Sequence, residues 1–115
     1  MPARNQPFSL FAGDDREITI TVKDADEALV DLTGAAIVWR LLLSGRQITI
    51  VEKSVGHGIA ISNQTTHQGQ CVVSLQSADT LYVDPAVLYH EADVTLGGLK
   101  STVVFGKVTL ERSGV

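Results

Sequence analysis

The chain contains 115 residues, of which 44% are hydrophobic and 19% are charged, and this length and composition are typical of one globular domain rather than of a disordered segment. The formal net charge is −4 at pH 7, and the Lys and Arg residues are scattered along the chain, so we expect no basic surface for nucleic acid. No apolar run reaches the roughly 20 residues that span a bilayer as a helix, and residues 1–6 lack the apolar core of a secretory signal, so we expect no membrane partner either.

The N-terminal part of the chain predicts a flexible lead, residues 1–7, before a single domain at residues 8–112. Residues 8–11 are expected to form a short edge strand or a hydrophobic peg. Residues 16–23 alternate between apolar and polar side chains, which is the period-two pattern of a half-buried strand. The apolar side chains that this pattern turns inward are those of Ile18, Ile20 and Val22.

Residues 35–43 predict the central strand of the domain. Successive side chains of a strand point to opposite faces, so the large apolar residues at odd positions define the core face. The even positions are mixed, which suits partial cover by a loop or by another subunit. The inward set is Ile37, Trp39, Leu41 and Leu43, and the outward set is Val38, Arg40 and Leu42. We expect Trp39, the single Trp, to fill the middle of a core between two sheets.

The middle of the chain predicts three shorter strands and one helical turn. A tight turn at residues 44–46 precedes the first of these strands, and a glycine break at residues 56–58 separates the first from the second. A helical turn is expected at residues 77–80, with Ser77 as its cap and Leu81 packed beneath it. The three strands are residues 47–53, residues 59–61, and residues 70–76 with Cys71, Val73 and Leu75 inward.

The C-terminal part predicts a long hairpin of two strands, residues 87–96 and residues 99–112, joined by a Gly-Gly turn. Gly106 is expected to mark a bulge or a kink. No segment shows a sustained helical period. Short strands at regular spacing indicate an all-β domain, either a β-sandwich or a closed barrel. The inward residues of the hairpin are Leu88, His90, Ala92, Val94, Leu96, Val108 and Leu110.

Three stretches of turn and strand sequence resemble a known family. They are residues 13–24 followed by 30–35, residues 58–61 followed by 69–75 and the turn at 78–80, and residues 89–95 with 101–110. Their order resembles small virion proteins of tailed phages and prophages that have an immunoglobulin-like sandwich, and is similar to the N-terminal module of phage baseplate upper proteins. The resemblance implies a single immunoglobulin-like β-sandwich of about seven or eight antiparallel strands, with a structural or assembly role in the virion.

Histidines and acidic turns are the candidate chemical groups. His90 and Glu91 are adjacent on a strand, so their side chains point to opposite faces and cannot act as an acid–base pair. We expect His90 to face the core, hydrogen-bonded to a backbone group, beside a solvated Glu91. His57 and His67 read as solvated loop residues, and three His without a fixed spacing are a weak metal signal.

The acidic turns have two interpretations. Carboxylates in a sandwich loop can bind calcium, but Asp also favours turns because its side chain bonds the local backbone, and we favour the second. Cys71 is the single cysteine, which excludes an internal disulfide and a cysteine-based metal site. We therefore expect no catalytic residue, no cofactor and no metal, and hence no enzyme activity. The acidic residues concerned are Asp14, Asp15, Asp24, Asp26 and Glu27.

Residues 41–43 and 103–105 are apolar on both faces of their predicted strands. A lone two-sheet domain needs only one apolar face per strand. The second face is covered either by a loop or by another subunit, and both explanations stay open. The candidate interface residues are Val38, Arg40, Leu42, Val103 and Phe105.

These observations and the resemblance together predict a non-enzymatic structural protein of a phage tail, baseplate or head–tail region. Its partners are expected to be other virion proteins and further copies of itself, with assembly in the cytoplasm of the host bacterium. The alternative is a capsid decoration or fibre-like domain with weak carbohydrate affinity, for which Tyr82 and Tyr89 are the candidate exposed aromatic residues.

Overall fold

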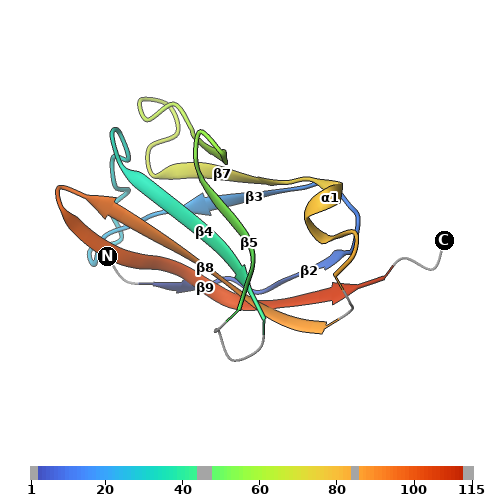
Figure 1. Cartoon of the computed structure of the whole chain (residues 1–115). Coiled ribbons are helices and arrows are strands. Elements are labelled where there is room, and N and C mark those ends of the chain that lie inside the picture. Colours follow the sequence, from blue (N-terminus) through green and yellow to red (C-terminus); the bar gives the residue numbers. More distant parts are fainter. Residues whose placement is uncertain (1–2, 44–47, 84–85, 113–115) are drawn as a thin grey trace.

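The computed structural model describes residues 3–43, 48–83 and 86–112. These residues form nine strands and one helical turn, α1 (Ser77–Thr80), so the all-β prediction is confirmed (Figure 1). The turn predicted at residues 44–46 lies outside the described residues. The strands are β1 (Arg4–Asn5), β2 (Phe8–Phe11), β3 (Arg16–Thr21), β4 (Ala36–Leu42), β5 (Thr49–Val55), β6 (Gly58–Ile61), β7 (Gln70–Leu75), β8 (Ala86–Leu96) and β9 (Leu99–Glu111).

The strands form one continuous mixed sheet in the order β1-β9-β8-β4-β5-β6-β7-β3, with β2 also paired to β9. Antiparallel pairing runs from β9 through β8 and β4 to β5, and again from β6 through β7 to β3. Only two residue pairs, in parallel register, join β5 to β6. The sheet therefore consists of two antiparallel halves that meet at one short joint.

The prediction of antiparallel strands throughout is wrong at three places. β1 and β2 both lie parallel to β9, and β5 lies parallel to β6. Parallel neighbours usually need a long crossover; for β1 and β2 the strands from β3 to β8 supply it, whereas β5 and β6 are joined by two residues and pair over only two positions. The alternation of residues along a strand does not report the direction of its neighbour, so this could not be read from the sequence.

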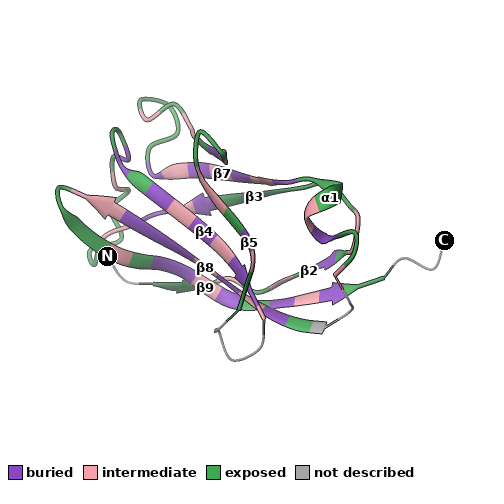
Figure 2. Cartoon of the chain, in the orientation of Figure 1, coloured by how far each residue is buried: buried purple, intermediate pink, exposed green. Residues whose placement is uncertain are grey.

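The curled sheet encloses a single core (Figure 2). One cluster of buried side chains includes Ile20 and Val73 from the β3–β7 half and Trp39 and Leu88 from the other half. The predicted odd face of β4 is confirmed, since Ile37, Trp39 and Leu41 are buried. The inward residues predicted for β3 and β7 are buried as well. The alternating pattern therefore placed the core residues correctly in both halves.

The helical turn differs from its prediction at both ends. The residue before the helix is Gln76, whose backbone N–H donates to Asp79 Oδ2 at 2.8 Å, so Ser77 is not the cap. The N–H of Ser77 instead donates to Asp15 Oδ1 at 2.7 Å. Two carboxylates, one inside the helix and one from the segment before β3, thus satisfy the first N–H groups, and the cap lies one residue earlier than predicted.

Leu81 does not pack beneath the helical turn, because its side chain is 43% exposed. The interior position belongs to Thr80, which is fully buried. Its hydroxyl oxygen accepts a hydrogen bond from Gly13 N at 3.0 Å. A buried polar group is tolerated when it has such a partner, so the threonine ties α1 to the turn before β3.

The domain begins earlier than predicted, because Arg4 and Asn5 form β1 and Gln6 N donates to Phe105 O at 2.8 Å. Residues 4–6 therefore belong to the sheet and not to a lead. Gly106 is neither a bulge nor a kink: it pairs in register with His90. A Cβ there would lie 2.8 Å from the backbone C and O of Gln6, so glycine is needed for the close approach of the N-terminal segment.

Candidate interaction surface

The outward face of β5, β4, β8 and β9 carries the predicted interface. Sheet register places Glu52, Arg40, Glu91 and Phe105 in one row across these four strands. Of the predicted residues, Val38, Arg40 and Phe105 are half-buried on this face. The structure thus brings these three together on one surface, although β4 and β9 lie far apart in the sequence.

Val103 belongs to the core, where it is 2% exposed. The pairing of β8 with β9 shifts here, because Ala92 faces Val104 while Asp93 faces Thr102. Val103 is therefore the extra residue of a β-bulge, which lets two successive side chains turn inward. The apolar run at residues 103–105 has this local cause, and Val103 supplies no outward surface.

Leu42 is also buried, next to a second register shift. Leu41 pairs with Val51, but Leu42 pairs with Thr49. Ile50 is skipped and is half-buried, while Ile48 just before the strand is 58% exposed. The strand predicted from residue 47 begins at Thr49, and of its residues Val51 lies in the core. The extra residue here is Ile50 on β5, and β4 keeps its register with β8, where Leu42 pairs with Tyr89. Leu42 therefore stays on the outward face and is buried there.

Arg40 is held by carboxylates on both neighbouring strands. Its Nε donates to Glu52 Oε1 at 2.8 Å, and its Nη1 lies 3.7 Å from Asp93 Oδ2. Asp93 is largely buried, and its second oxygen accepts the hydroxyl of Thr102 at 2.8 Å. Lys100 lies 3.7 Å from the same carboxylate. Ion pairs at this exposure add little stability, but they fix the guanidinium within the outward face.

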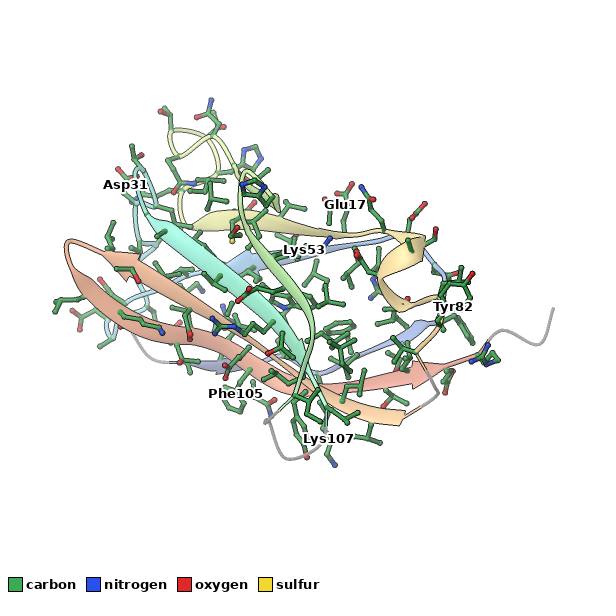
Figure 3. All side chains as sticks on the ribbon, viewed as in Figure 1. Glu17, Asp31, Lys53, Tyr82, Phe105 and Lys107 are labelled. Atoms are coloured by element: carbon green, nitrogen blue, oxygen red, sulfur yellow. The ribbon has the colours of Figure 1, made fainter. Side chains whose placement is uncertain are left out.

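A groove of about 390 Å³ crosses the lower edge of this face, where Figure 3 labels Phe105 and Lys107. Phe105 and Tyr89 are half-buried, and Lys107 is exposed. Two aromatic rings, a proline and one ammonium group give the groove an apolar floor with a cationic rim. The residues that line it are Asn5, Pro7, Tyr89, Phe105, Gly106 and Lys107.

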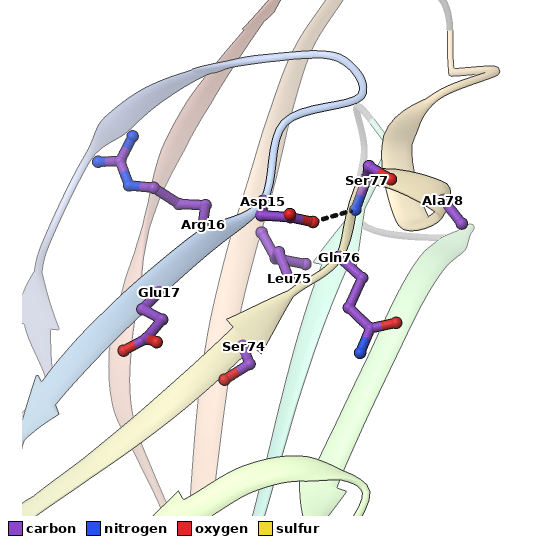
Figure 4. Close-up of a pocket in the computed structure, with 8 residues that line it drawn as sticks. All are labelled: Asp15, Arg16, Glu17, Ser74, Leu75, Gln76, Ser77 and Ala78. Carbon is purple, nitrogen blue, oxygen red and sulfur yellow. Dashed lines mark hydrogen bonds between the residues drawn. The ribbon is translucent and has the colours of Figure 1, made fainter.

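A second, larger cleft of about 520 Å³ lies where β3 and β7 meet α1 (Figure 4). Asp15 and Glu17 on one side face Ser74 and Ser77 on the other. Asp15 is already engaged with the backbone of Ser77. The sequence did not predict this cleft, because the feature that marks it in the sequence is only a run of polar residues at the end of a strand. The cleft holds no His or Cys, so it offers hydrogen-bonding groups but no nucleophile with an activating base.

His90 forms a buried network on the inward face, and its predicted core-facing position is confirmed. Its side chain is 1% exposed. Trp39 Nε1 donates to His90 Nδ1 at 3.0 Å, and His90 Nε2 lies 2.6 Å from Gln6 O. An indole N–H only donates and a carbonyl only accepts, so Nδ1 is unprotonated and Nε2 carries the hydrogen. Burial lowers the pKa of His90 below its ordinary value, although the bond to Gln6 opposes this.

Two of the carboxylates in turns, those of Asp15 and Asp24, bond to backbone groups. Asp24 Oδ1 accepts the N–H groups of Asp26 and Ala28 at 2.8 and 3.0 Å, which is the turn role expected for Asp. Among residues 3–43, 48–83 and 86–112, no group of three or more His, Cys, Asp or Glu side chains is arranged to hold a metal ion. In the same residues, no helix has the length and apolar character needed to cross a membrane.

Tyr82 projects from the loop after α1 and is 89% exposed (Figure 3). Tyr89, the other tyrosine expected at the surface, is half-buried in the groove. Comparison with known proteins adds no relative, because no protein-family model and no curated protein matches the chain.

Proposed function

We propose that this protein is a structural component of a tailed-phage or prophage particle, in the tail, baseplate or head–tail region. Its fold is proposed to be an immunoglobulin-like sandwich in which β3, β7 and β6 pack against β9, β8, β4 and β5. This division of the strands into two antiparallel sets around one core supports the assignment. The sequence resemblance over residues 8–112 supports the virion context.

The observation that carries the interaction role is the groove beside the Arg40 ion pairs. Protein interfaces are enriched in aromatic residues and arginine at their centres. Here Tyr89, Phe105 and Arg40 occupy one face of a sheet, and their positions are set by backbone pairing or by ion pairs. The bound partner is proposed to be a further copy of the chain or a neighbouring virion protein that covers this face.

The first test measures self-association by native mass spectrometry and equilibrium sedimentation. We expect oligomers of the wild-type chain, and an association constant at least about tenfold weaker, or about 1.4 kcal/mol, in Phe105→Ser and Lys107→Glu. Leu99→Ser is the matched control, because Leu99 is an exposed apolar residue of the same strand at the far hairpin. A strict monomer, or equal weakening by Leu99→Ser, contradicts self-association through this groove.

The second test is mass spectrometry of intact particles from an induced lysate of the source strain. The proposal requires this chain at fixed stoichiometry with capsid and tail proteins. Its absence from intact particles, with the protein abundant in the lysate, rejects a structural role in the virion.

A capsid decoration or fibre-like domain with weak carbohydrate affinity is the second candidate. One observation favours it: Tyr89 and Phe105 form an aromatic floor on which a sugar ring could stack. Binding on a glycan array that is lost in Phe105→Ser supports this candidate, and an array without signal removes it.

A further inference from the structure

The N-terminal segment, residues 4–11, is attached to the domain through β9 and through two apolar side chains, Leu10 in the core and Phe8 packed against it. β1 and β2 pair with β9 alone in the described sheet. Between them, Gln6 makes three hydrogen bonds: its N–H donates to Phe105 O at 2.8 Å, its amide Nε2 to Thr19 O at 3.4 Å, and its carbonyl accepts from His90. Gln6 is therefore the fixed point between two short strands.

His90 is central to this attachment. Besides its bond to Gln6 O, its ring meets the ring of Phe8 edge to face, with 4.9 Å between the centroids. Gly106 opposite His90 leaves the space through which Gln6 passes. The imidazole thus contacts both the backbone and an aromatic side chain of the segment from the core side.

We propose that His90 is an acid-sensitive latch for the N-terminal segment. The neutral ring fits its site in one tautomer, because Nδ1 must accept the Trp39 N–H while Nε2 donates to Gln6. A second proton would go to Nδ1 and place two donors against each other at 3.0 Å. It would also put a positive charge among apolar side chains, which is costly without a paired anion. Moving the ring toward solvent relieves both costs and breaks the contacts with Gln6 and Phe8.

The groups around His90 do not supply that anion. β4 and β9 present Trp39, Leu41 and Gly106 to it, and β2 presents Phe8. From β3, the Arg16 guanidinium lies 5.7 Å from the centre of the Phe8 ring, and this positive charge would not stabilise an imidazolium. In the core, burial raises the pKa of the Cys71 thiol on β7 to about 11, and the thiol is therefore neutral.

The other charged side chains of these strands point away from His90. Arg40, Glu91 and Lys107 alternate with inward residues and lie on the outward face. Among the described residues, the hydrogen bonds of His90 are those to Trp39 and Gln6, and no carboxylate forms a hydrogen bond or an ion pair with it. Release of the segment would leave Phe105 O and Glu111 O without the N–H groups of Gln6 and Ala12, so the edge of β9 would open.

Hydrogen exchange of the full-length chain tests the latch. We compare protection of the Gln6 and Ala12 amides at about pH 7.5 and about pH 5, after correction for the intrinsic pH dependence of exchange. We expect protection of the Gln6 and Ala12 amides to fall at least about tenfold at the lower pH, and we expect amides of β4 and β8 to be better protected than these two at both pH values. Nitrogen NMR shifts of His90 should report the loss of its single tautomer over the same pH range.

Two variants sharpen the test. Trp39→Phe removes the N–H that opposes a proton on Nδ1, so a protonated ring can stay in its site and the loss of protection at the lower pH should be smaller than in the wild type. His67→Gln, which changes an exposed loop histidine, should leave the release unchanged. The latch is overturned if the segment keeps its protection at about pH 5, if amides of β4 and β8 exchange as fast as those of Gln6 and Ala12 at that pH, or if His67→Gln abolishes the transition.

Discussion

Strands β4 and β8 carry two polar networks on opposite faces, built from neighbouring residues. On the inward face, Trp39 and His90 share one hydrogen bond away from water. On the outward face, Arg40 pairs with Glu52 and with Asp93 in partial contact with solvent. One step along β4 and three along β8 thus separate a neutral, fully enclosed pair from a set of partly exposed charges.

The two networks differ in what their loss would cost. Removing one partner of a buried hydrogen bond leaves the other unsatisfied, at about 1–3 kcal/mol on top of any lost packing. An exposed ion pair contributes about 0–1 kcal/mol, since water solvates each partner when the other is gone. The inward network therefore specifies the fold, whereas the outward one can be rearranged by a partner without endangering it.

The largest expected effect comes from Trp39→Ala. The side chain is fully buried at the centre of the core, and its removal leaves a cavity as well as an unsatisfied His90 Nδ1. We expect a loss of about 3–5 kcal/mol in the free energy of unfolding, measured by urea denaturation. A loss below about 1 kcal/mol would contradict the central position of this residue.

Gly106→Ala tests how tightly the N-terminal segment approaches β9. The new Cβ would meet backbone atoms of Gln6 and Pro7 at 2.8–3.0 Å, and backbone cannot yield as a flexible side chain does. We expect about 1–3 kcal/mol of destabilisation, with faster exchange of the Gln6 amide. The control is Gly97→Ala at the hairpin, where the space is open and only the left-handed backbone (φ 61°) opposes alanine; it should leave the Gln6 amide unaffected.

The pH dependence of stability tests the neutral state of His90. Since burial lowers its folded-state pKa, the unfolded chain binds the proton more readily. The neutral His90 contributes its full stabilisation of the folded state above the unfolded-state pKa of about 6.5. This contribution is lost as the pH falls from that value toward the folded-state pKa, and it amounts to about 1.4 kcal/mol for each pH unit between the two pKa values. Urea titrations between about pH 8 and pH 5 should show this fall in wild type and in His67→Gln alike.

Asp31 affects the free energy of unfolding in a lower pH range, so it does not interfere with the measurement on His90. Its pKa is lowered because the hydroxyl and N–H of Thr33 donate to the carboxylate. The stability linked to it is lost only as the pH falls below the ordinary carboxyl pKa of about 4.

The smallest effect is expected for Lys100→Ala on the outward face. Its ammonium is mostly exposed and lies 3.7 Å from Asp93, while Arg40 and Thr102 still satisfy that carboxylate. We expect a change within about 0.5 kcal/mol, reduced further by salt. A loss above about 1 kcal/mol would mean that the outward network is also structural.

The sequence predicted those features that depend on alternation within a single strand. The inward positions of Trp39, Ile20 and His90 follow from the period of two and from side-chain size. The partner of His90 did not follow, because Trp39 lies 51 residues away and pairs with it only through the register of β4 and β8. The parallel pairing of β1 and β2 with β9 also joins segments that are far apart in the sequence, so it could not be predicted either.

The candidate surface was predicted in part. A bulge shifts the alternation of β9 by one residue, so Val103 is buried although its pattern placed it outside. Leu42 keeps the outward face, opposite Tyr89 on β8, but it is buried there. Arg40 and Phe105 lie away from the extra residues and keep their predicted face. Glycine at position 106 suggested an irregularity, but it marks a close backbone contact that the sequence alone does not distinguish from a bulge.

The buried thiol of Cys71 can report how often the core of the protein opens to solvent. It lies on β7 inside the core, and burial raises its pKa to about 11. A labelling reagent therefore cannot reach the sulfur in the folded protein, and the thiol is not in the reactive thiolate form. The rate of alkylation therefore measures how often the β3–β7 half separates from the rest. That kinetic readout needs no engineered probe, and it would distinguish breathing of the core from detachment at the β9 edge.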